Sequence, residues 1–199
     1  HGLSTLQRKP TLGLATLMRV AGLDKPQLDA EDIAFTLGPR LNAAGRLGQA
    51  QLAVELLITD RPERAQELAQ YVDQLNATRQ SLERSIYLAA NKQIKEQFDP
   101  ENDPALVLAH HEWHPGVIGI VAGKLAEKYH RPVVLIAWDQ LGVKPGSGSA
   151  RSVPGFDLHL ALQACQAHLL SYGGHAAAAG LTIQEEKLES FRADFCEYV

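Results

Sequence analysis

Apolar residues recur at helical spacing through the first sixty residues, interrupted by glycine and proline. This pattern predicts a series of short helices rather than strands. Gly22 ends the first of them, and the second stops before Gly38 and Pro39, because both residue types end helices readily. The helices are expected over residues 12–21, 29–35, 42–47 (a small-residue turn or a short helix) and 52–58.

A much longer helix is predicted from Asp60 onwards. Asp60 is a favourable N-cap, Pro62 stands in the first turn, and Glu63 follows the cap by three residues. No glycine or further proline occurs before Pro100, and leucines recur every seven residues. Such a helix would measure about 55 Å at 1.5 Å per residue, a length that usually connects two domains. The alternative is a helical hairpin with a turn near Asn76.

After a polar break at residues 100–104, the pattern changes to strands alternating with helices. Residues 105–109 and 133–138 are apolar runs typical of buried strands, and residues 117–129 predict an amphipathic helix between them. Strand, crossover helix and strand form a right-handed unit with parallel strands. The remaining elements are expected as a strand or loop over residues 146–152, a helix over 157–169, a turn at Gly173 followed by a helix, a strand over 181–183 and a helix over 185–199.

We therefore predict the α/β fold class: a helical N-terminal segment and a long connecting helix, followed by an α/β domain with a mixed, partly parallel sheet. The expected boundaries are residues 1–59 for the helical segment, 60–99 for the connecting helix and 104–199 for the α/β domain. His1 stands where a complete chain would begin with methionine, so we expect a fragment of a longer protein.

The composition is that of an ordinary globular protein, with 45% hydrophobic and 21% charged residues. A net charge of −4 argues against a histone-like nucleic-acid binder but leaves room for a local basic groove. Cys165 and Cys196 are expected to be buried, reduced thiols, with a disulfide as the less favoured alternative. The sequence shows no membrane-spanning stretch and no signal peptide, so we expect a cytoplasmic protein without membrane contact.

The segment Gly173–Gly180 is the most informative part of the chain. Gly173 and Gly174 allow a sharp turn and a close approach to a ligand, and the alanines after His175 favour the start of a helix. Backbone N–H groups at a helix start, beside an imidazole, would form a seat for an anion such as phosphate. An ordinary tight turn is the alternative.

Two further segments place arginines among small or hydroxyl residues. Arg40, Asn42 and Arg46 are surrounded by alanine and glycine, which would let a guanidinium lie against a phosphate. If residues 146–152 form a strand, Ser149 and Arg151 project from the same face and make a phosphate clamp. The alternatives are solvated arginines on a helix and a polar edge strand.

Three histidines and a glutamate cluster in residues 110–116, just before a predicted helix. Their spacing matches no zinc pattern, so we expect no metal ion there. The segment instead follows the first strand, where α/β folds place ligands. Trp113 is expected either to stack on a base or to form a half-buried lid.

The sequence lacks several catalytic signatures. It has no Walker A lysine motif, no dinucleotide fingerprint, no strand-to-helix hydrolase elbow and no clustered aspartates and histidines for a metal pair. The chain therefore carries phosphate-binding features without an evident catalytic group.

Four segments in this order resemble the RecJ family of single-stranded-DNA-specific exonucleases, within the DHH phosphoesterase superfamily. They are Pro39–Arg46, Trp113–Ala122, Ser149–Ser152 and Gly173–Gly180. The resemblance runs from end to end. The last segment alone marks only the broader DHH-associated domain.

The resemblance implies a catalytic DHH domain, a long connecting helix and a DHH-associated domain that forms the other wall of a DNA groove. It implies 5′-to-3′ digestion of single-stranded DNA in DNA repair and recombination, with manganese or magnesium activating water. The family's metal-binding motifs are not found in this chain. We therefore expect the metal only in the full-length enzyme, none bound by this chain, and no nuclease activity from this chain alone. Single-stranded DNA is the implied ligand, with a single-strand-binding protein and a helicase as partners.

The resemblance also implies roles for individual residues. Ser149, Arg151 and the loop at Gly174 would hold the 5′-terminal phosphate, and His175 would either join them or act catalytically on the scissile phosphate. The full set of expected DNA and 5′-phosphate contacts is Arg40, Asn42, Arg46, His114, Ser149, Arg151, Gly173, Gly174 and His175.

Two alternatives to the exonuclease interpretation remain. One is a DHH-family phosphodiesterase that acts on short oligonucleotides or cyclic dinucleotides. The other is a non-catalytic module that binds single strands, in keeping with the net charge and the missing metal ligands.

Overall fold

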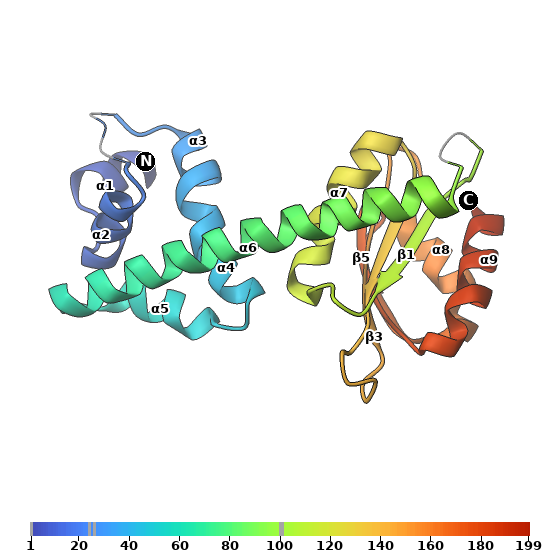
Figure 1. Cartoon of the computed structure of the whole chain (residues 1–199). Coiled ribbons are helices and arrows are strands. Elements are labelled where there is room, and N and C mark those ends of the chain that lie inside the picture. Colours follow the sequence, from blue (N-terminus) through green and yellow to red (C-terminus); the bar gives the residue numbers. More distant parts are fainter. Residues whose placement is uncertain (1, 24, 26, 100–101) are drawn as a thin grey trace. The chain divides into compact units, whose positions relative to one another are not determined.

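The computed structural model describes residues 2–23, 25, 27–99 and 102–199. The chain divides into two compact units, His1–Ser81 and Leu82–Val199. The division falls inside the long helix α6 (Pro62–Gln97), which is drawn in green in Figure 1. Each unit is described by itself.

The first unit is helical. Its elements are α1 (Gly2–Arg8), α2 (Leu12–Val20), α3 (Ala30–Asp32), η1 (Ile33–Leu37), α4 (Gly38–Arg46), α5 (Ala50–Ile58) and the first part of α6. The Thr11 side chain caps α2 by accepting from the Leu14 N–H, and Gly22 follows its end with φ of 69°. Leu17, Leu56 and Leu68 are buried in the core of this unit.

The predicted helix end before Gly38 and Pro39 is wrong. The chain continues through one π-helical turn, Ile33–Leu37, directly into α4, and the Gly38 N–H donates to the Ile33 carbonyl five residues earlier. Pro39 has no N–H to donate to the preceding turn and its ring needs extra room there. The wider π turn provides this room, so the helix passes the proline instead of ending.

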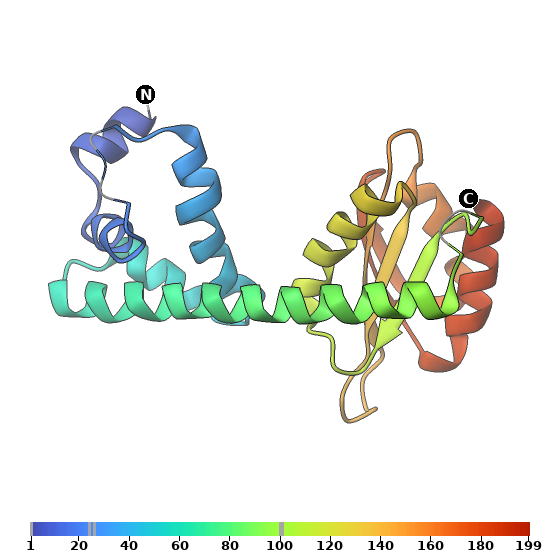
Figure 2. The same cartoon turned by 45° about the horizontal axis from the view of Figure 1, so that its top comes forward.

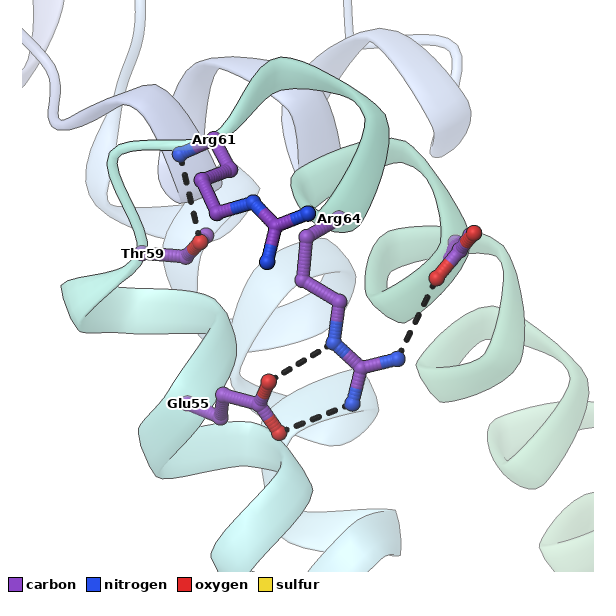
Figure 3. Close-up of polar contacts among 5 residues, drawn as sticks. Glu55, Thr59, Arg61 and Arg64 are labelled. Carbon is purple, nitrogen blue, oxygen red and sulfur yellow. Dashed lines mark hydrogen bonds and ion pairs between the residues drawn. The ribbon is translucent and has the colours of Figure 1, made fainter.

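Arg64 fixes the junction between α5 and α6. Its Nε and Nη2 donate to the two carboxylate oxygens of Glu55 at 2.7 and 2.9 Å, and its Nη1 donates to Glu67 at 3.2 Å (Figure 3). This pair lowers the pKa of the Glu55 carboxyl and raises the pKa of Arg64. At the same junction the Arg61 N–H donates to Thr59 Oγ1 at 3.3 Å.

The long helix is confirmed, and the alternative of a hairpin near Asn76 is wrong. Helix α6 comprises 36 residues without interruption. Asn76 is buried on it, and its side-chain carbonyl accepts from Arg79 Nη2 at 2.7 Å. The asparagine amide is therefore used within the helix and does not form a turn.

The second unit contains a five-stranded sheet in the order β1-β2-β3-β5-β4. The pair β1–β2 is parallel and the other pairs are antiparallel, so the predicted mixed, partly parallel sheet is confirmed. The strands are β1 (Leu106–His110), β2 (Val133–Ala137), β3 (Gly146–Arg151), β4 (Leu169–Gly174) and β5 (Ala178–Ile183).

Helices cover both faces of this sheet. Figures 1 and 2 show α7 (Pro115–Tyr129) on one face and the pair α8 (Leu158–Ala164) and α9 (Leu188–Tyr198) on the other. On the side of α8 and α9, Ile136, Leu181 and Phe191 are buried in one apolar cluster.

The second part of α6 contacts α7 through polar groups. Glu83 forms an ion pair with Lys124. Asn91 Oδ1 accepts from Lys128 Nζ at 2.6 Å and from the Tyr129 hydroxyl at 2.8 Å. These contacts hold the end of the long helix against the α/β domain.

Two predicted elements near the C-terminus are wrong. The helix expected over residues 157–169 ends at Ala164, and a short 3-10 turn, η2 (Gln166–His168), leads into β4. The helix expected after His175 is strand β5, which pairs with both β3 and β4. Pairing on both sides outweighs the helix propensity of a few alanines.

Both cysteines are free thiols, as predicted; Cys165 is buried, whereas Cys196 is only half-buried. Burial raises the pKa of Cys165 to about 11. In the part of the chain that the structure describes, no helix has both the length and the apolar character needed to span a bilayer.

Candidate nucleic-acid interface

Strand β3 presents alternate residues to two different environments. Gly146, Gly148 and Ala150 are buried against the core. Ser149 and Arg151 lie on the opposite face, as the period of two predicts. Arg151 Nη1 donates to Ser149 Oγ at 3.1 Å and to the Ala150 carbonyl at 2.7 Å. A hydroxyl and a guanidinium therefore stand side by side on this strand.

The two positions in line with Ser149 on the neighbouring strands are glycines. Ser149 is paired with Gly180 of β5, which is paired in turn with Gly173 of β4. Directly opposed residues of antiparallel strands project from the same face, so this row has one hydroxyl and two bare backbone positions. Both glycines are exposed, and nothing lies within 4 Å of the position that a Cβ of Gly173 would take. The two positions in line with Ser149 therefore leave exposed backbone beside its hydroxyl.

The hairpin tip between β4 and β5 lies next to the end of β3. The Ser152 N–H, directly after Arg151, donates to the Ala177 carbonyl at 3.0 Å. Within the tip, the His175 N–H donates to the Ala178 carbonyl at 2.9 Å. The tip is thus tied to the chain that follows Arg151, and the fold brings together Ser149, Arg151 and the hairpin predicted to bind with them.

Gly174 gives the hairpin its shape. Its φ is 144°, and a Cβ there would lie 2.5 Å from the Ala178 carbonyl oxygen. Only glycine adopts this backbone without strain. The His175 side chain that follows is exposed. The predicted seat of N–H groups at a helix start is absent here, because these residues form a hairpin and not a helix.

His114 begins α7. Its Nδ1 accepts from the Gly116 N–H at 3.1 Å, which caps the helix and fixes the ring. The ring lines a cavity of 570 Å³ at the carboxyl ends of β1 and β2, together with Trp138 and Ser147. Trp113 is only 4% exposed and stacks against His110, so it is a buried residue and not a free face for a base.

In the first unit, the predicted arginine segment forms α4. Asn42 and Arg46 are one turn apart on this helix and both side chains are exposed. Arg40 is directed elsewhere: its Nε donates to Asp73 of α6 at 2.7 Å and its Nη1 to the Thr36 carbonyl at 2.8 Å. Asn42 and Arg46 are therefore exposed side by side on α4, whereas Arg40 forms an ion pair that holds α4 on α6.

The residues described in both units offer no group of three or more histidine, cysteine, aspartate or glutamate side chains that could hold a metal ion. The histidines of residues 110–116 have other contacts. His110 Nδ1 accepts from the Glu112 N–H at 3.1 Å, and His111 Nε2 lies 3.3 Å from Glu185.

Gly119 lies within the segment Trp113–Ala122 but was not among the predicted site residues. The structure places it on α7 directly against Ser149 and Arg151. The available signal was two glycines, at positions 119 and 123, on the helix predicted over residues 117–129. Glycine disfavours helices, so a repeated glycine there indicates a close approach by another group.

The chain is similar to known proteins over nearly its whole length. The family model described as the DHHA1 domain matches residues 102–199. The chain is 39% identical over 193 residues to the single-stranded-DNA-specific exonuclease RecJ of Bacillus subtilis (strain 168), an alignment that covers 96% of this chain and 24% of that protein.

Solved structures give the same result. RecJ from Thermus thermophilus in complex with Mg²⁺ matches with a TM-score of 0.85 and 37% identity, covering 99% of this chain and 30% of that one. The Mn²⁺ complex of RecJ from the same organism has the same TM-score and identity, and 28% of its chain is covered. The chain thus spans less than a third of the length of these relatives.

Proposed function

Because this chain is homologous to the RecJ exonucleases over nearly its whole length and carries a DHHA1 domain, we propose that it supplies the DNA-binding part of a single-stranded-DNA-specific 5′-to-3′ exonuclease. In this proposal the second unit binds the 5′-terminal phosphate of the strand. The first unit contacts the DNA backbone.

The hydrogen-bonded Ser149–Arg151 pair, in a row with the exposed Gly180 and Gly173, is the observation that carries the proposal. A guanidinium donates two parallel hydrogen bonds to phosphate oxygens, and a neighbouring hydroxyl adds a third donor. The row of Gly180 and Gly173 beside Ser149 leaves space for a strand end to reach this pair. A terminal phosphate carries more negative charge than an internal phosphodiester, so the site favours a strand end.

The hairpin tip completes the proposed site. Its exposed His175 extends from a loop that hydrogen bonds fix to the end of β3. A protonated imidazole would donate to the 5′ phosphate, or it would act catalytically by stabilising charge on the scissile phosphate. His114, which caps α7 beside Ser147, would contribute from the other end of β3.

In the first unit, Arg46 and Asn42 are the proposed contacts to the DNA backbone, because both side chains are exposed on one face of α4. A DNA contact by Arg40 stays a prediction. Its ion pair with Asp73 gives it a second role, to hold α4 in place for its neighbours.

We place the metal chemistry outside this chain. Manganese or magnesium, when bound to the whole enzyme, would activate water for the hydrolysis, but the described residues offer no group that fits such an ion. We therefore expect the isolated chain to bind single strands without cleaving them. A single-strand-binding protein and a helicase remain the expected partners. Two free thiols suit the reducing cytoplasm in which we expect the protein to act.

Fluorescence anisotropy with one labelled single strand, carrying either a 5′ phosphate or a 5′ hydroxyl, tests this function. We expect the phosphorylated strand to bind the chain about tenfold more tightly or better, since a charge-assisted hydrogen bond contributes about 1.5–3 kcal/mol. The variant Arg151→Ala should abolish this preference.

The control is Lys95→Ala, which removes one exposed positive charge from α6 outside the proposed site. It should change the affinity for the two strands by the same factor, if at all, and leave the preference for the 5′ phosphate intact. Equal binding of the two strands by the unsubstituted chain would disprove the 5′-phosphate assignment. A preference for dinucleotides or trinucleotides over longer strands would favour a phosphodiesterase of short oligonucleotides instead.

A further inference from the structure

Helix α7 carries glycine at positions 116, 119 and 123, although glycine is among the least favourable residues in a helix interior. Gly119 and Gly123 are one turn apart and therefore lie on the same face. This face meets β3, since the groups nearest to both glycines belong to Ser149 and Arg151.

The Arg151 side chain runs along this glycine face. Its Cγ lies 3.9 Å from the position that a Cβ of Gly123 would take. Further along, its Nη2 lies 2.9 Å and its Cζ 3.6 Å from the corresponding position at Gly119. The guanidinium thus occupies space that a methyl group on residue 119 would need.

Ser149 occupies the same space. Its Oγ lies only 2.8 Å from the Cβ position of Gly119, and it accepts from Arg151 Nη1. Carbon atoms in contact are usually separated by about 3.5–4.0 Å, so an added methyl group would displace both polar atoms. At Gly123 the 3.9 Å separation is an ordinary contact, and a methyl group fits.

We propose that Gly119 is a positioning residue, whose missing side chain lets the Arg151 guanidinium lie beside Ser149 in the orientation that receives the 5′ phosphate. The inference rests on the proposed function of this pair. It adds that α7 determines the geometry of the pair.

The expected effect of Gly119→Ala separates function from stability. The atoms that must move are ends of side chains, so the fold accommodates the methyl group, and alanine favours the helix. The same displacement alters the two groups proposed to bind phosphate. If Gly119 served only to stabilise the fold, its replacement would lower the unfolding temperature and leave the preference for the 5′ phosphate unchanged.

The test measures the 5′-phosphate preference of Gly119→Ala and Gly123→Ala by anisotropy, with thermal unfolding of each variant followed by circular dichroism. We expect Gly119→Ala to lose at least about tenfold of the preference, the contribution of one charge-assisted hydrogen bond, without a fall in its unfolding temperature. Gly123→Ala should keep both the preference for the 5′ phosphate and the unfolding temperature of the unsubstituted chain. In the Arg151→Ala background, Gly119→Ala should have no further effect, because its action passes through Arg151.

A DNA-free measurement distinguishes failure of this inference from failure of the proposed function. NMR of the arginine side chains should show the Arg151 guanidinium shifted and more mobile in Gly119→Ala than in Gly123→Ala. If the unsubstituted chain prefers the 5′ phosphate and Gly119→Ala retains the preference, or if the Arg151 signal is unchanged, the inference is wrong. If the unsubstituted chain shows no preference, the proposed function fails and the positioning role fails with it.

Discussion

Two adjacent glycines in the hairpin have different physical reasons to be there. Gly174 has φ of 144°, and a Cβ would come within 2.5 Å of the Ala178 carbonyl oxygen and of the Ala179 Cα. Gly173 has nothing within 4 Å of its Cβ position. Gly174 therefore determines the backbone conformation of the hairpin, whereas Gly173 leaves its surface open.

We expect Gly174→Ala to lower the free energy of unfolding by about 2 kcal/mol or more, because it combines backbone strain with a clash against backbone atoms. Gly173→Ala, the matched control, should change it by less than about 0.5 kcal/mol. Urea unfolding of both variants checks this expectation. Equal destabilisation by the two substitutions would contradict the conformation given to the hairpin.

The polar residues of the candidate site were predictable from the sequence, whereas the glycine that accommodates them was not. Ser149 and Arg151 were predictable as a same-face pair, because strand periodicity needs only residue types and spacing. The role of Gly119 was not, because it depends on which helix covers which strand. A glycine within a predicted helix indicates that another group approaches closely, but the sequence does not show which group it is.

Among the elements, the long helix α6 was predictable and the β4–β5 hairpin was not. The signals for α6 are local: a cap, an early proline and a long stretch without helix breakers. The alanines after His175 have local preferences for helix, and long-range pairing with β3 overrides them. Likewise, Gly38 and Pro39 are residue types that usually end helices, yet the helix continues through them after one π-helical turn.

The junction of α5 and α6 should respond to acid through Glu55. Its pKa is lowered by the hydrogen bonds from Arg64, so the folded unit binds a proton less readily than the unfolded chain. This stabilisation is present above the unfolded-state pKa of about 4.3 and is lost as the pH falls through the lower folded value. Glu55→Gln should therefore unfold with a shallower dependence on pH between about pH 5 and pH 3.

The measurement is urea unfolding followed by circular dichroism at 222 nm, at several pH values. Glu67→Gln is the control, because the Glu67 side chain is more exposed than that of Glu55 and accepts from Arg64 only at 3.2 Å. It should retain most of the pH dependence of the unsubstituted chain. An identical pH dependence in Glu55→Gln and the unsubstituted chain would show that the ion pair contributes nothing to stability.

For the whole molecule, the net charge of −4 restricts how it can bind DNA. A chain with 23 acidic and 19 basic residues cannot attract a polyanion by its overall field, so binding must depend on a few local contacts. The proposal supplies two such contacts from arginine, Arg46 in one unit and Arg151 in the other. Each phosphate neutralised on a single strand contributes about −0.7 to the slope of log K against log salt concentration.

Binding of a 5′-phosphorylated single strand should therefore show a shallow slope, about −1.4 if both arginines contact the same strand. Anisotropy titrations between about 50 and 300 mM salt measure it, and Arg46→Ala and Arg151→Ala should each make the slope shallower by about 0.7. Only Arg151→Ala should also remove the preference for the phosphorylated end, because an internal backbone contact does not distinguish strand ends. A slope steeper than about −4 that neither substitution alters would indicate diffuse attraction, which the charge of this chain does not support.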